Sequence, residues 1–139
     1  MEHPSTPLIA ELDAIAVPVV LAMGEVLFQT GDPGEGVYLL RTGRIAFTRT
    51  EDQRHYSMGT LGPGSMIGLP AVLNGTYSLT AQALETSALG FVSESQVISL
   101  LACYPRLRLE AMKALAKDLA SLRSMIAENE DHQHRATLD

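Results

Sequence analysis

Side chains able to perform catalysis are few and isolated in this sequence. The 139 residues contain one cysteine and four histidines, and their spacing forms no Ser-His-Asp, Cys-His or paired-carboxylate arrangement. His132 and His134 alternate beside Asp131 in a polar stretch that is too loose to hold a metal ion well. Gly31-Asp32-Pro33-Gly34 predicts a turn and not a phosphate loop, because the Lys-Ser/Thr pair of such a loop is missing. We therefore expect no catalytic residues and no metal ligands.

Composition points to one soluble domain with an ordinary core. A chain of 139 residues with 46% hydrophobic content suits a single globular domain. The net charge of −6 disfavours direct binding to nucleic acid or to an anionic membrane. The single cysteine, Cys103, excludes an internal disulfide and fits a reducing compartment, and we expect it to be a buried packing residue. Because residues 1–5 show no secretory signal, we expect a cytoplasmic protein.

The middle of the chain is rich in short strand-like runs. Residues 17–92 alternate such runs with turns rich in Gly, Pro, Asn and Asp, which predicts a mainly β sandwich or barrel. A helical pattern at Leu8–Ile15 precedes them, within an N-terminal helical segment at 1–16. The expected strands are Val17–Met23, Glu25–Gln29, Val37–Arg41, Arg44–Thr50, Arg54–Gly59, Leu79–Leu84 and Ala88–Val92.

The C-terminal part, residues 93–128, has a helical character. Ser93 and Gln96 have the spacing of a capping box that opens a short helix through Leu101. Tyr104-Pro105 should break this helix, and Pro105 suits the first turn of the next one. Residues 106–128 contain no Gly or Pro and predict a long helix, whereas 129–139 form a polar tail.

An apolar seam runs along the long helix. Its members recur at heptad positions a and d: Met112, Leu115, Leu119, Leu122 and Ile126. A seam this narrow favours pairing with the same helix of a second chain, in a homodimer. The alternative is that the stripe packs against the β-structure of its own chain.

The segment Gly24–Ile45 closely resembles the cyclic-nucleotide-binding domain family, which includes the catabolite activator protein and the regulatory subunits of protein kinase A. The matching features are Gly24, Leu27-Phe28, Gly31-Asp32, Gly34, Tyr38-Leu39-Leu40 and Gly43. The resemblance extends over roughly residues 10–128. It implies a jelly-roll-like β-roll (a double-stranded β-helix) with flanking helices, the long C-terminal helix being the usual dimer element.

The resemblance also places a phosphate-binding cassette at residues 64–80, and here the family's two charged anchors are missing. Leu69 stands where the family has a ribose-binding Glu, and Tyr77 or Ser78 stands at the Arg position. No Lys or Arg occurs between Arg54 and Arg106 to replace that cation. The candidate ligand-binding residues are Gly68, Leu69, Ala71, Val72, Tyr77, Ser78, Leu79 and Thr80. Because a buried phosphate needs a partner charge, we predict that cyclic AMP does not bind tightly.

The sequence thus favours a regulatory or sensory domain, with two alternatives left open. The ligand would be a cyclic nucleotide or another small molecule. One alternative is a ligand-free interaction module of the same fold, with an unknown protein partner. The other is a signalling partner of a transcriptional regulator. The family's bacterial regulators carry a helix-turn-helix domain after the long helix; we expect none here, and so no direct DNA binding.

Overall fold

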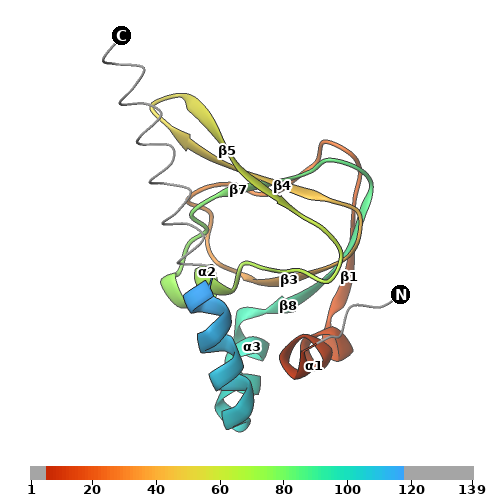
Figure 1. Cartoon of the computed structure of the whole chain (residues 1–139), viewed down its shortest axis with the longest axis vertical. Helices are drawn as coiled ribbons and strands as arrows, with labels where there is room; N and C mark the ends of the chain where they lie inside the picture. The colour runs from red at the N-terminus through yellow and green to blue at the C-terminus, as the bar shows by residue number, and fades with distance from the viewer. Residues whose placement is uncertain (1–5, 118–139) are drawn as a thin grey trace.

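The computed structural model describes residues 6–117, which form a β-roll of two antiparallel four-stranded sheets (Figure 1). The first sheet has the strand order β1-β8-β3-β6, and the second has the order β2-β7-β4-β5. The strand bounds are β1 Val17–Leu21, β2 Val26–Phe28, β3 Gly36–Thr42, β4 Ile45–Glu51, β5 Arg54–Leu61, β6 Met66–Ile67, β7 Thr80–Ala83 and β8 Ser87–Ser93. This architecture confirms the predicted fold class.

Helices cover one side of the roll. Figure 1 shows α1 (Pro7–Ile15), α3 (Glu94–Cys103) and the helical residues 105–117 beside the sheet that contains β3 and β8. The short helix α2 (Leu69–Asn74) lies between β6 and β7 in the chain. The Leu8 amide donates to both carboxylate oxygens of Glu110 at 3.2 Å, so the first turn of α1 is tied to the C-terminal helix.

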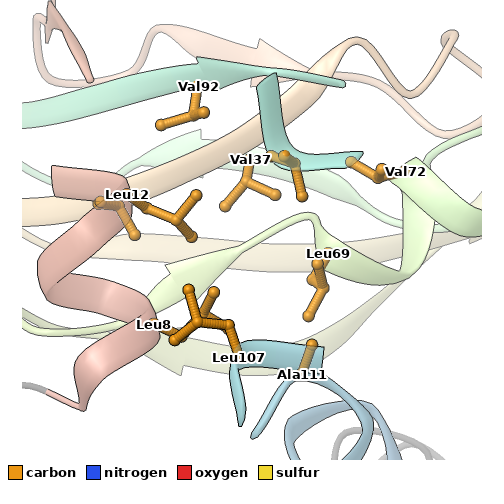
Figure 2. Close-up of a cluster of buried hydrophobic side chains, with 10 residues drawn as sticks. Leu8, Leu12, Val37, Leu69, Val72, Val92, Leu107 and Ala111 are labelled. Atoms are coloured by element: carbon orange, nitrogen blue, oxygen red, sulfur yellow. The ribbon is translucent and has the colours of Figure 1, made fainter. Parts of the chain in front are cut away.

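Strand β3 separates the core into two layers because its side chains alternate between its faces. Val37 and Leu39 face the helices, and Leu40 faces the interior of the roll. The helix-facing cluster, drawn in Figure 2, contains Leu8, Leu12, Val37, Leu39, Leu69, Val72, Val92, Val97, Leu107 and Ala111. The roll interior contains Leu21, Phe28, Leu40, Ile45, Ile67, Ala71, Tyr77, Ala81, Ala83 and Leu89.

The capping box at the start of α3 is confirmed. Ser93 Oγ accepts from the Gln96 amide at 3.4 Å, and the Ser93 amide donates to Gln96 Oε1 at 3.3 Å. The helix ends at Cys103, and the next begins at residue 105, as the Tyr104-Pro105 pair predicts. The expectation that Cys103 is buried is wrong: it is exposed at the last position of α3.

Two of the predicted seam residues lie in the described part of the long helix, and they differ in their surroundings. Met112 is 65% exposed, whereas Leu115 is half-buried and packs against the helix-facing cluster. Leu119, Leu122 and Ile126 lie outside the described residues. The helix-facing cluster of the same chain therefore covers Leu115, whereas Met112 is open to solvent.

Over residues 6–117, no helix has both the length and the apolar character that crossing a membrane requires.

Candidate functional site

A pocket of about 270 Å³ opens between the second sheet and the segment that carries α2. Its apolar lining consists of Phe28, Phe47, Met58, Leu61, Met66, Ile67, Pro70, Ala71 and Leu79. Uncharged polar side chains and glycines complete it: Gly59, Thr60, Gly68, Asn74, Thr76, Tyr77 and Ser78. The pocket thus includes much of the cassette segment predicted at residues 64–80 and adds residues of β2, β4 and β5.

Backbone hydrogen bonds fasten the loop at residues 31–34 to the wall of this pocket. The Gly31 amide donates to the Tyr77 carbonyl at 2.8 Å, and the Tyr77 amide donates to the Asp32 carbonyl at 2.9 Å. The Gly34 amide donates to the Gly75 carbonyl at 2.8 Å. A Cβ at Gly34 would overlap the carbonyl oxygen of Ala71, so only glycine allows this close approach to α2. These contacts hold the loop at residues 31–34 against the wall of the pocket.

The Tyr77 side chain is packed and hydrogen-bonded within this wall. Its side chain is only 4% exposed, and its ring stacks on Phe28 with the two ring centroids 3.7 Å apart. Its hydroxyl donates to the Gly36 carbonyl at 2.8 Å and accepts from the Gly36 amide at 3.4 Å. Burial raises the pKa of the Tyr77 phenol, so this group stays neutral at physiological pH. Of the two positions that the resemblance offers for a cation, Tyr77 thus holds an uncharged aromatic that links β2, β3 and the cassette, and Ser78 holds a neutral hydroxyl.

Leu69 points away from the pocket. It is 2% exposed, and Figure 2 shows it directed toward Leu107 and Ala111 in the helix-facing cluster. Gly68 precedes it with φ of 95°, a left-handed conformation that favours glycine and that turns the chain from β6 into α2. A leucine in this apolar cluster packs well, whereas a carboxylate there would be buried without a partner.

The structure brings together five of the eight predicted ligand-binding residues: Gly68, Ala71, Tyr77, Ser78 and Leu79 line the pocket. Leu69 and Val72 belong instead to the helix-facing cluster. Thr80 is not among the lining residues, and its Oγ1 accepts from the Thr30 amide at 3.0 Å.

Sequence reasoning missed two of the three aromatic residues of the lining, Phe28 and Phe47. The available signal was the two-residue alternation of the strands that carry them, because alternate side chains of a roll strand face inward.

The lining is electrically neutral as far as the described residues go. None of the lining residues is Lys, Arg, His, Asp or Glu. Arg44 reaches only the margin, where its Nη1 donates to Thr60 Oγ1 at 3.2 Å. Some backbone donors of α2 are also unavailable: Pro70 has no N–H, and the amides of Ala71 and Val72 donate to the Gly68 carbonyl at 3.1 and 3.3 Å. An anion in this pocket would lose its water and meet little to replace it.

Comparison with known sequences assigns the family. The cyclic nucleotide-binding domain family matches residues 18–104, which span the β-roll, α2 and α3. The chain belongs to this family. The family match thereby confirms the resemblance carried by the glycines and aromatic residues of the segment 24–45.

Proteins similar to this chain include bacterial regulators. The chain is 29% identical over 107 residues to the transcriptional activator protein anr of Pseudomonas aeruginosa, covering 76% of this chain and 44% of that protein. It is 30% identical over 103 residues to an anaerobic regulatory protein of Pasteurella multocida, covering 73% of this chain and 38% of that protein. The chain thus spans less than half the length of these relatives.

Several solved structures share the fold of this chain. The N-terminal domain of a transcriptional regulator from Streptomyces coelicolor is 28% identical, with a TM-score of 0.68 and coverage of 86% of this chain and 85% of that one. The EAL enzyme Bd1971 in its cAMP-bound form is 27% identical, with a TM-score of 0.63 and coverage of 84% and 32%. The catabolite activator protein of Thermus thermophilus has a TM-score of 0.78 at 22% identity, which shows the fold alone.

Proposed function

We propose that this chain is a non-enzymatic regulatory domain that acts in the cytoplasm as a homodimer and binds cyclic AMP only weakly. The observation that carries the proposal is the pocket itself, whose described lining contains no charged side chain. Membership of the family and similarity to bacterial regulators support a sensory role for the domain. The uncharged lining of the cassette supports weak binding of the cyclic nucleotide that gives the family its name.

The extent of this weakening follows from the two replaced anchors. A hydrogen bond to a charged group contributes about 1.5–3 kcal/mol. Leu69 cannot supply such a bond because it packs against the helices. Tyr77 is already bonded to Gly36, and Ser78, the alternative Arg position, carries no charge. Loss of two such bonds corresponds to roughly a hundredfold to ten-thousandfold lower affinity for a cyclic nucleotide.

The C-terminal helix supports the dimeric part of the proposal. Leu109 and Met112 are 54% and 65% exposed and lie three residues apart, on neighbouring positions of one helical face. Apolar side chains with this exposure are stabilised when a second helix covers them. The same helix of a second copy is the partner that the heptad spacing favours.

A second candidate function is a ligand-free interaction module. The observation in its favour is that Tyr77 and Phe28 stack on each other at 3.7 Å and fill part of the roll interior with the protein's own rings. In that case the protein would act by binding a partner through the exposed helical face that carries Leu109 and Met112. Ligand-dependent stabilisation separates the two candidates, because a ligand raises the melting temperature only if it binds the native state.

Thermal unfolding with cyclic AMP tests the proposal, using the wild type, Ser78→Arg and Ser57→Arg. Ser78 is exposed and lines the pocket, so an arginine there restores a cation near the site. Ser57 is an exposed serine on β5 outside the lining and is the matched control. We expect cyclic AMP to raise the melting temperature of Ser78→Arg only. A clear rise for the wild type would contradict the proposal.

A further inference from the structure

We infer that the pocket binds an uncharged, largely apolar small molecule that carries a hydroxyl, carbonyl or amide group at one end. The inference rests on the proposed function, in which this pocket does not serve cyclic nucleotides. The surfaces that the pocket presents indicate the chemistry of its occupant.

The body of the pocket is apolar and has a defined size. Phe47, Met58, Met66 and Leu79 contribute aromatic, thioether and aliphatic surface from four separate segments. The volume of about 270 Å³ lies just below the usual range for small-molecule sites, about 300–1,000 Å³. Such walls favour a compact ring or a branched hydrocarbon. When either molecule leaves water and enters the pocket, apolar surface of the molecule and of the lining is buried.

Three uncharged polar side chains stand along one segment of the lining, and they give the occupant its polar end. Asn74, Thr76 and Ser78 are exposed, and their side chains make no hydrogen bond with another residue in the described part of the chain. By contrast, the hydroxyls of Tyr77 and Thr60 are engaged with Gly36 and Arg44. Amide and hydroxyl groups both donate and accept, so they suit a neutral hydroxyl, carbonyl or amide.

Charge decides between a neutral and an anionic occupant. A phosphate, sulfate or carboxylate must be compensated when it leaves water, and the described lining offers no cationic side chain for this. A neutral molecule has no such requirement. Its affinity should therefore exceed that of the same ring system bearing an acidic group.

The test uses two dyes that share one scaffold. N-phenyl-1-naphthylamine is uncharged, 8-anilino-1-naphthalenesulfonate carries a sulfonate, and both fluoresce more strongly in apolar surroundings. We expect the full chain to bind the neutral dye saturably with one site per chain, with at least about tenfold higher affinity than the sulfonate. Unlabelled indole, a smaller neutral ring, should displace the bound dye.

Two variants locate the binding. Leu79→Glu places a carboxylate in the lining at a half-buried position outside both core clusters, and it should weaken dye binding about tenfold or more. Leu73→Glu makes the same change on α2 at a leucine that is 58% exposed and outside the lining, and it should leave binding within about twofold.

Each outcome decides one of the two proposals. Saturable binding that Leu79→Glu removes and Leu73→Glu retains supports the inference. Equal affinity for the two dyes, insensitivity to Leu79→Glu, or no saturable binding of the neutral dye or indole would overturn it. A parallel titration with cyclic AMP keeps the failures distinct, because tight cyclic AMP binding refutes the proposed function whatever the dyes do.

Discussion

The replacement Tyr77→Phe removes a single oxygen atom from the wall of the pocket. The Phe ring retains the stacking on Phe28, whereas the buried Gly36 carbonyl loses the donor that lies 2.8 Å away in the wild type. A buried acceptor left without a partner costs about 1–3 kcal/mol. We expect the free energy of unfolding to fall by about 1–2 kcal/mol, within this range, because the stacking remains.

Urea unfolding monitored by circular dichroism measures this loss. Tyr104→Phe is the matched control, since the Tyr104 side chain is 53% exposed and the structure gives its hydroxyl no hydrogen bond among residues 6–117. The control should change stability by less than about 0.5 kcal/mol. If the two replacements lowered the free energy of unfolding equally, the Tyr77 hydroxyl would not stabilise the fold through its hydrogen bond to Gly36.

Three further predictions concern the helix, the 31–34 loop and pH. Met112→Asp should convert the dimer to a monomer in light scattering, whereas Ile98→Asp, at an exposed apolar position on α3, should leave it dimeric; the reverse result would exclude the helix as the interface. Gly34→Ala should destabilise the fold by about 1–3 kcal/mol in urea unfolding, because its Cβ overlaps the Ala71 carbonyl. Gly62→Ala, whose Cβ would have Arg44 Nη2 at 3.5 Å, should not. Burial raises the pKa of Tyr38 from its usual value near 10 to about 12. The phenol therefore keeps its proton to a higher pH in the native state than in the unfolded state. Its contribution to stability is therefore present below pH 10 and is lost between about pH 10 and 12, and Tyr38→Phe should reduce that alkaline loss in urea titrations.

The sequence predicted the architecture because the local signals and the fold agree. The glycine-rich turns separate strands whose bounds lie within a few residues of the predicted runs. The capping box formed by Ser93 and Gln96 begins α3, as predicted. The strand β6 was not separated from its flanking turns, since two residues carry no periodicity.

The site was harder to predict than the fold. The missing charges at Leu69 and Tyr77 were readable from the sequence, but their new roles were not. Leu69 packs against Leu107, thirty-eight positions along the chain, and Tyr77 bonds to Gly36, which lies on a different strand. Such long-range contacts depend on the tertiary arrangement and leave no local pattern. Val72 packs in the helix-facing cluster and Thr80 bonds to the Thr30 amide, so neither lines the pocket, and no local pattern indicated these contacts.

The affinity of the full chain for cyclic AMP, measured by isothermal titration calorimetry, tests the central claim most directly. The neutral lining predicts no saturable heat up to about 100 μM nucleotide, given the roughly hundredfold or greater penalty of two missing charged anchors. Saturable one-to-one binding with a Kd in the low micromolar range or below would contradict it. That result would mean that backbone amides and neutral side chains alone are enough to hold the phosphate.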